Sequence, residues 1–170
     1  MALLNYQFNN LNDLFIHELK DLYDAEHRLI DALPQMADAA VSSDLKQCFN
    51  SHLEQTRDHV RRLEEVFRGI NCEPDREACK AMKGIVDEGS DIVSAKGDDK
   101  VRDAGLIGAA QRAEHYEIAG YGTARTFAQQ LGRTDLASIL QSILNEEGET
   151  DKKLTSLAES HVNWEAKAQA

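Results

Sequence analysis

The sequence predicts an all-α protein, a bundle of four long helices arranged as two antiparallel hairpins that a helical crossover joins. Two observations lead to this fold class. The 170 residues include only two prolines and ten glycines, a composition that favours helices. Apolar residues also recur at steps of three and four along four stretches, about 11–41, 43–69, 100–131 and 135–161. Such spacing is typical of the buried face of an amphipathic helix.

The two helices of the first hairpin have recognisable ends. Asn10, with Asp13 in the following turn, is the expected N-cap of the first helix. Pro34 is expected to bend this helix near its last turns. Ser43 is expected to begin the second helix and Gly69 to end it.

The connections between the helices determine the expected topology. Residues 75–95 are expected to form a shorter helix, Gly132 to end the third long helix and Thr134 to begin the fourth. Short connections make each consecutive pair a hairpin, and about 30 residues between the hairpins allow a crossover along the bundle. This is the ferritin-like arrangement. We expect a single domain over residues 1–170, with its core bundle at about 10–161.

Composition excludes several classes of function. The 30 acidic and 19 basic side chains give a net charge of −11, which argues against nucleic-acid binding and suits a protein that attracts metal cations. An acidic helix surface is also a common solubility device. No apolar stretch is long enough to cross a membrane, and the N-terminus lacks the basic and apolar regions of a secretory signal. The three cysteines match no zinc spacing. Cys72 and Cys79 flank a loop and could pair, but we expect reduced thiols in a cytoplasmic protein.

Each of the four apolar stripes is interrupted near its middle by acidic, amide or imidazole side chains. These interruptions are Glu26 in the first stripe; His52, Gln55 and His59 in the second; Glu114 in the third; and Glu147 and Asp151 in the fourth. They fall close to the midpoints of their helices, so they should meet at one level of the bundle. Buried carboxylates are costly unless they are paired or bind a metal. We therefore expect a metal site inside the bundle.

The residue types predict two ions of iron or manganese, because the donors are carboxylates and imidazoles without a thiolate. Two helices should supply one ligand each, and the other two should supply a pair. The expected ligands are Glu26 and Glu114 as single donors, Glu147 with Asp151, and His59 with Gln55 or Glu54. The expected neighbours that support the ligands are His52, Tyr121 and His115, the last of which could itself be a ligand.

Each of these residues also has a simpler interpretation. His59 could be a core histidine with satisfied hydrogen bonds. Glu26 could pair with Arg125, and Glu147 could belong to a solvated acidic face with its neighbours. Taken together, these alternatives require partners for several buried acids at one level, and few basic residues lie on the stripes. The metal site explains all of the acids at once.

Several short motifs resemble the YciE/YciF-type ferritin-like stress proteins of bacteria. The motifs are Tyr23-Asp-Ala-Glu26, His52-Leu-Glu-Gln-Thr56, Ala113-Glu-His-Tyr-Glu-Ile-Ala119 with Tyr121-Gly122, and Glu146-Glu147 followed by Thr150-Asp-Lys-Lys-Leu154. The resemblance extends over about residues 10–160. It implies a rubrerythrin- and ferritin-like fold, a dinuclear metal site, a homodimer and a role in the stress response.

The chain departs from the ferritin-like pattern in two ways. The Glu-x-x-His motif expected on two helices is absent, with Arg57 and Thr150 standing where histidine is expected. Gln55 occupies a place where the family commonly has a carboxylate. Because an amide adds no charge, the metal position beside His59 is expected to bind less tightly than the position beside Glu147 and Asp151.

Two functions follow from these expectations. The first is a di-metal oxidoreductase that oxidises Fe(II) or consumes peroxide or oxygen, since two adjacent redox metals supply two electrons. The second is a stress-induced structural or binding protein in which a metal, if bound, only braces the bundle. The missing Glu-x-x-His motifs and Gln55 favour the second function.

Overall fold

The computed structural model describes residues 6–168, which form a bundle of long helices and no strand. The helices are α1 (Leu11–Ala39), α2 (Ser43–Gly69), α3 (Lys80–Val93), α4 (Asp99–Gln130) and α5 (Thr134–Leu157), followed by the π-helical turn η1 (Ala158–Val162) and the short α6 (Asn163–Lys167). None of these helices is long and apolar enough to cross a membrane. The expectation about a secretory signal falls partly on residues 1–5, which lie outside the described residues.

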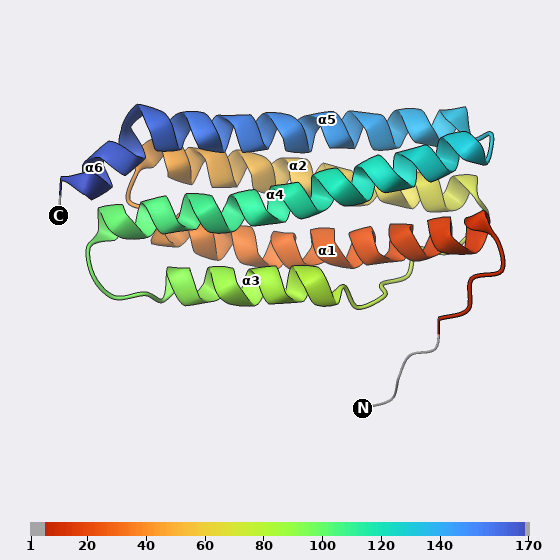
Figure 1. Cartoon of the computed structure of the whole chain (residues 1–170), viewed down its shortest axis with the longest axis horizontal. Helices are drawn as coiled ribbons and strands as arrows, with labels where there is room; N and C mark the ends of the chain where they lie inside the picture. The colour runs from red at the N-terminus through yellow and green to blue at the C-terminus, as the bar shows by residue number, and fades with distance from the viewer. Residues whose placement is uncertain (1–5, 169–170) are drawn as a thin grey trace.

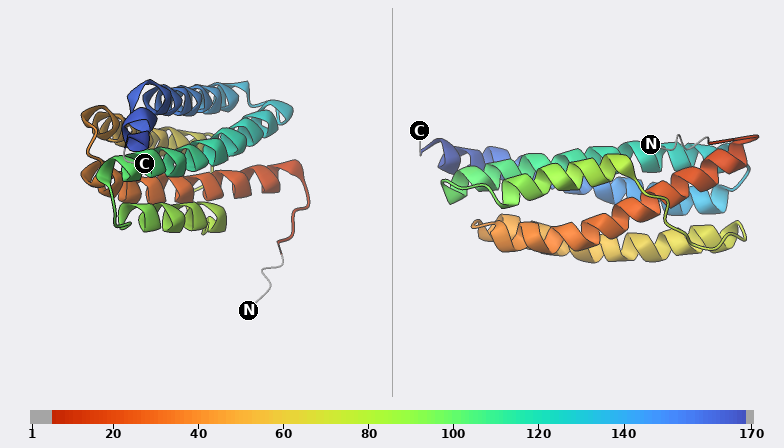
Figure 2. Two further views of the ribbon diagram at one scale, coloured as in Figure 1. Left: turned by 60° about the vertical axis from the view of Figure 1, so that its left-hand side comes forward. Right: turned by 90° about the horizontal axis from the view of Figure 1, so that it is seen from below.

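The four long helices pack as two antiparallel hairpins, α1 with α2 and α4 with α5 (Figure 1). The hairpins meet through α1 against α4 and α2 against α5. The crossover helix α3 lies outside the four-helix core, along α1 and α4 (Figure 2). The predicted fold class, an all-α bundle of two hairpins and a helical crossover, is confirmed.

Local chemistry explains where the long helices begin and end. The Asn10 side chain accepts a hydrogen bond from the Asp13 amide at 2.9 Å, as an N-cap does. α2 begins at Ser43 as predicted, and the preceding Ser42 caps it. Gly69 ends α2 as predicted, and a Cβ at this position would lie 2.7 Å from a Leu136 methyl group of α5. Glycine therefore permits the close approach of α5 there.

The crossover begins later than the sequence suggested, at Lys80 instead of about residue 75. Asp24, buried on α1, accepts hydrogen bonds from the Arg76 guanidinium at 2.9 Å and from the Cys79 amide at 2.8 Å. These bonds hold the preceding segment against α1 in a non-helical conformation. The Cys79 sulfur then accepts from the Met82 amide and caps α3. A single buried carboxylate thus decides where the crossover helix starts.

The core consists of two apolar clusters, one in each half of the bundle. One contains Leu29, Leu33, Phe49 and Leu106, and the other contains Phe15, Leu19, Phe67 and Leu140. On α1, Glu26 lies between Leu22 of the second cluster and Leu29 of the first. The layer of polar residues that was predicted at the helix midpoints therefore lies between the two apolar clusters of the core.

Candidate metal centre

Six buried ionisable side chains from the four long helices meet at the level between the two apolar clusters. We call them the central cluster: Glu26 of α1, His52 and His59 of α2, Glu114 and Glu117 of α4, and Glu147 of α5. None of the six is more than 3% exposed. Such a concentration of buried acids needs a compensating positive charge.

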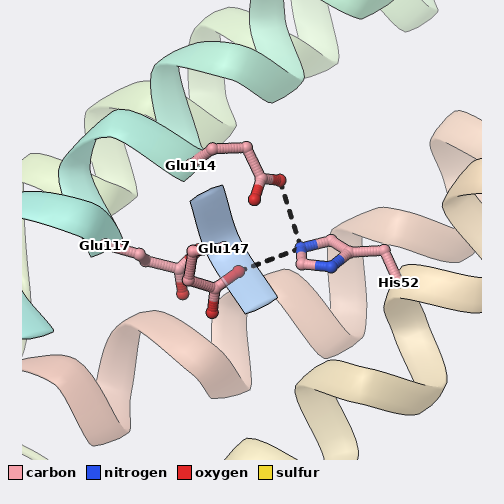
Figure 3. A group of neighbouring side chains, drawn as sticks. All are labelled: His52, Glu114, Glu117 and Glu147. Atoms are coloured by element: carbon pink, nitrogen blue, oxygen red, sulfur yellow. Dashed lines mark ion pairs between the residues drawn. The ribbon is translucent and has the colours of Figure 1, made fainter. Parts of the chain in front are cut away.

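The cluster contains two overlapping groups of potential metal ligands. In the first, His52, Glu114, Glu117 and Glu147 each offer one donor atom within 4.8 Å of the others (Figure 3). His52 Nε2 lies 3.1 Å from Glu114 Oε1 and 3.9 Å from Glu147 Oε2. The second group contains Glu26, His59 and again Glu147. Here His59 Nδ1 lies 2.9 Å from Glu147 Oε1 and 3.3 Å from Glu26 Oε1.

Glu147 belongs to both groups and directs one carboxylate oxygen toward each. If each group held a cation, Glu147 would be the residue that both cations share. The four glutamates carry four negative charges when they are ionised, and two divalent cations would balance them. The donor set of carboxylates and two imidazoles, without a thiolate, is one that iron and manganese accept.

The hydrogen bonding of the cluster fits a set of side chains that hold a cation. Each of the six side chains has at least one buried oxygen or ring nitrogen with no hydrogen-bond partner among the described residues. Both carboxylate oxygens of Glu117 and of Glu147 are in this state. Buried polar atoms in proteins nearly always have partners. Because the unpaired atoms belong to residues that share one space, the residues present fit a pair of bound cations.

His59 is held with one ring nitrogen facing the cluster. Its Nε2 lies 3.0 Å from Glu146 Oε2. Two hydrogen bonds from Arg62, at 2.9 and 2.6 Å, fix Glu146 in turn. Although partial burial acts to raise the pKa of Glu146, the hydrogen bonds from Arg62 and His59 lower it. An ionised carboxylate can only accept, so Nε2 donates and Nδ1 faces Glu26 and Glu147, as in histidines that bind metals.

Two other candidate ligands, His52 and Glu26, have comparable supports. Thr150 donates its hydroxyl to the Glu146 carbonyl oxygen at 3.1 Å, so it accepts from His52 Nδ1 at 3.4 Å. This leaves His52 Nε2 directed toward Glu114. On the opposite side of the cluster, the buried Tyr121 hydroxyl donates to Glu26 Oε1. Two of the residues expected to be supports are thus placed beside ligands: Tyr121 as a donor to a ligand, and His52 as a potential ligand itself.

Without a cation, the cluster retains protons. Burial raises the pKa of Glu26, Glu114 and Glu117, with the neighbouring Glu147 carboxylate adding to the effect, and for Glu114 the pKa reaches about 7. Burial alone would lower the pKa of the two histidines. The facing carboxylates outweigh it and raise the pKa of His52 to about 9 and that of His59 to about 11. A bound cation would take the place of these protons.

We expect the stability of the metal-free protein to fall as the pH rises toward about 9. The pKa of His52 is raised from 6.5 to about 9 and that of Glu114 from 4.5 to about 7. The folded state therefore binds more protons than the unfolded state, and the free energy of unfolding decreases with pH. The contribution of Glu114 is lost between pH 4.5 and about 7, and that of His52 between pH 6.5 and about 9.

Thermal unfolding of chelator-treated and Mn(II)-loaded protein across this pH range measures the effect. The loaded protein should lack this decline, because the cations have displaced the protons. If the melting temperature changed with pH in the same way with and without metal, the folded metal-free protein would not bind the extra protons that we assign to Glu114 and His52.

The structure brings together four of the predicted ligands and leaves three outside the central cluster. Glu26, His59, Glu114 and Glu147 lie within it. Glu54 lies on the surface of α2, where it pairs with Arg57. It faces away from the bundle because it is two residues from His52, which turns it to the opposite side of the helix.

Asp151, Gln55 and His115 lie at the edges of the bundle. Asp151 accepts a hydrogen bond from Gln111 at 2.9 Å in the seam between α4 and α5. His115 is mostly exposed and lies 3.3 Å from Asp151, outside the cluster. Gln55 is only half-buried. Weaker metal binding beside His59 stays a prediction. Its reason is no longer the neutral amide of Gln55 but the number of candidate ligands, which is three in the group around His59 and four in the group around His52.

The ligands expected from the sequence did not include Glu117, whose two carboxylate oxygens both lack a hydrogen-bond partner among the described residues. Glu117 is fully buried and follows Glu114 by three residues, so both face the same side of α4. The predicted stripe went from Glu114 to Ile118, a step of four, because isoleucine suits an apolar stripe better. The structure buries Glu117 and leaves Ile118 half-buried. A second acid at three residues from a suspected ligand was the signal that could have revealed it.

Known proteins resemble this chain over nearly its whole length. The family described as "Domain of unknown function (DUF892)" matches residues 10–167. Protein YciF of Escherichia coli (strain K12) is 43% identical over 161 residues, covering 94% of this chain and 97% of that protein. The crystal structure of the E. coli stress protein YciF superposes with a TM-score of 0.88 and covers 92% of this chain and 99% of that one.

Two further solved structures have a similar fold. YcfI from Rhodopseudomonas palustris, described as a putative structural protein, is 36% identical with a TM-score of 0.87, covering 91% of this chain and 98% of that one. A ferritin-like diiron-carboxylate protein from Bacillus anthracis has a TM-score of 0.68 at 17% identity, covering 88% of this chain and 99% of that one. At this identity the likeness concerns the fold alone, and it confirms the predicted ferritin-like bundle.

Proposed function

The chain belongs to the DUF892 family, and from this premise we propose that it is a ferritin-like di-metal protein that oxidises Fe(II) or consumes peroxide or dioxygen at the central cluster. The resemblance of its motifs to the YciE/YciF-type stress proteins is confirmed by the likeness to YciF over most of the chain. The observation that carries the proposal is the convergence of four glutamates and two histidines, with unpaired atoms, in a dry core.

Two bound iron or manganese ions would supply the two electrons that, with two protons, convert hydrogen peroxide into two water molecules. The side chains of the cluster would hold the ions, and their neighbours orient the ligands and exclude water. Glu147 faces both ligand groups, and Tyr121 and Thr150 orient Glu26 and His52. The apolar clusters on either side exclude water, which strengthens the attraction between the carboxylates and a cation.

His59 and Glu146 connect the cluster with solvent. The Glu146 side chain is 35% exposed, and its carboxylate accepts from His59 Nε2. The Glu146 carboxylate therefore lies at the border of the cluster, where it can exchange protons with solvent while His59 Nδ1 faces the proposed cation. The reduction of an oxidant consumes protons, so such a connection supports a redox role more than a purely structural one.

The names of similar proteins are consistent with the proposal without defining the reaction. YciF is described as a stress protein, and the more distant Bacillus anthracis structure as a diiron-carboxylate protein. Iron or manganese, an oxidant and a stress role are thus properties that we propose for this chain. A cytoplasmic location and a homodimer likewise stay predictions from the sequence.

The experiment is to load metal-free protein with Fe(II) under anaerobic conditions and then add peroxide or dioxygen. We expect a ferric absorbance change in the natural protein that is lost in Glu26→Ala, because one ligand group then retains only His59 and Glu147. Glu88→Ala, on the exposed side of α3, is the matched control and should behave like the natural protein. Absence of metal uptake by the natural protein, as shown by elemental analysis, would refute the proposal.

A structural role is the second candidate function. It is favoured by the description of the similar Rhodopseudomonas palustris protein as a putative structural protein. In this case the cations would only cross-link the four helices. Chelation would then lower the melting temperature, while the iron-loaded protein would react no faster with peroxide or dioxygen than free Fe(II) does.

A further inference from the structure

A pocket between α1, α3 and α4 leads from the surface to the central cluster. Its volume is about 170 Å³. The exposed Gln35, Asp87 and Ser90 lie at its rim. Its interior is lined by buried apolar side chains, including Leu29 and Leu33, which also belong to one of the two apolar clusters.

Small residues create this space where the crossover helix meets the bundle. Gly89 of α3 lies opposite Ala109 of α4, and a Cβ at Gly89 would lie 3.8 Å from the Ala109 Cβ. Ala110 and Ala113, one turn apart on α4, continue the lining inward. Larger side chains at these positions would fill the pocket. The open space is therefore a consequence of particular residues at the interface of α3 and α4.

The pocket reaches a ligand of the proposed metal centre. Glu114 is part of its lining and is 2% exposed. Its Oε1 faces His52, while its Oε2 has no hydrogen-bond partner among the described residues. An apolar space that ends on an unpaired buried carboxylate of the cluster is suited to deliver a molecule there.

We propose that this pocket is the route by which dioxygen reaches Glu114 and the central cluster. The proposal rests on the function proposed above and selects one of its two oxidants. Dioxygen is small and apolar, and it loses no hydrogen bonds when it leaves water for apolar walls. Hydrogen peroxide has two hydroxyl groups, whose transfer into such walls without partners is costly. We expect peroxide to enter instead where polar side chains lie beside the cluster, as the half-exposed Glu146 does.

Xenon tests whether the pocket binds a small apolar molecule, independently of any reaction, since apolar cavities of comparable size bind it. Crystals of the full chain under xenon pressure should show a xenon site between Leu33 and Gly89. Gly89→Leu should abolish this site, because its side chain would extend into the pocket. Gly84→Leu is the matched control: it places the same residue on the same helix, where a Cβ contacts nothing within 4 Å.

Oxidation kinetics test the route itself. In iron-loaded protein, Gly89→Leu should slow the reaction with dioxygen by about tenfold or more. The reaction with peroxide should keep its rate, and Gly84→Leu should leave both rates unchanged. All three proteins should take up the same amount of Mn(II), which shows that the metal centre is intact.

The possible outcomes separate this inference from the proposed function. No xenon site, equal slowing with both oxidants, or no slowing with either would overturn the route while the function stands. If the loaded natural protein reacts with neither oxidant, the proposed function fails and the route with it. A xenon site would then show only that the pocket binds small apolar molecules.

Discussion

Replacing Glu147 with glutamine should lower the metal content of the protein from about two ions per chain to fewer than about one. Among residues 6–168, Glu147 alone belongs to both groups of candidate ligands. Glutamine keeps the shape of the side chain, but it removes one negative charge and one of the two oxygens that face the two groups. Both positions should therefore be affected, whereas the loss of any other ligand should affect mainly one.

Equilibrium dialysis against Mn(II) or Fe(II), followed by elemental analysis, measures this change. Glu149→Gln is the control, because Glu149 lies two residues further along α5 on the exposed side and pairs with Lys152. It should retain full occupancy. If Glu147→Gln binds as much metal as the natural protein with the same affinity, Glu147 does not bridge two ions and the arrangement proposed for the cluster is wrong.

Replacing Glu117 with leucine should change stability in opposite directions with and without metal. In the metal-free protein both Glu117 oxygens are buried and have no partner in the described part of the chain. Burial, together with the charges of Glu147, Glu26 and Glu114, raises the pKa of Glu117. Leucine removes an unsatisfied polar group that costs about 1–3 kcal/mol. At about 2–4 °C per kcal/mol for a chain of this size, the melting temperature of the metal-free protein should rise by about 2–12 °C.

With metal present, the same substitution removes a ligand. The increase in melting temperature on adding Mn(II), which follows from preferential binding to the folded state, should therefore become smaller in Glu117→Leu. Differential scanning calorimetry with chelator and with Mn(II) gives both values, and Glu149→Leu on the surface of α5 serves as the control. A Glu117→Leu protein that is less stable than the natural one under both conditions would show that Glu117 has a structural partner instead of a metal.

The level of the site along the bundle could be predicted from the sequence. Glu26, His59, Glu114 and Glu147 each lie near the middle of a long amphipathic segment, and the short connections make these segments antiparallel neighbours. Since the rise per residue of a helix is constant, residues near the midpoints of such helices must meet. The start of the first helix and the end of the third long helix were predictable because the side chain of Asn10 and the backbone freedom of Gly132, whose φ is +75°, act locally.

The rotation of each helix about its axis could not be predicted. Steps of three and four are both compatible with a helical stripe, so Glu117 and Ile118, or Thr150 and Asp151, were equivalent choices in the sequence. The structure buries Glu117 and Thr150 and moves Asp151 to the edge. On α4 the buried face is also widened by the crossover, since α3 packs against it as well as α1 and α5.

The sequence alone therefore determined the all-α fold, the pairing of the helices and the level at which acids and imidazoles meet. These depend on helix periodicity, caps and loop lengths, which act within short stretches of chain. The tertiary structure decided which acids face the centre, that His52 stands beside Glu114, and that Glu147 faces both ligand groups. These features depend on how each helix turns against its neighbours, and that is set by the packing of all five helices together.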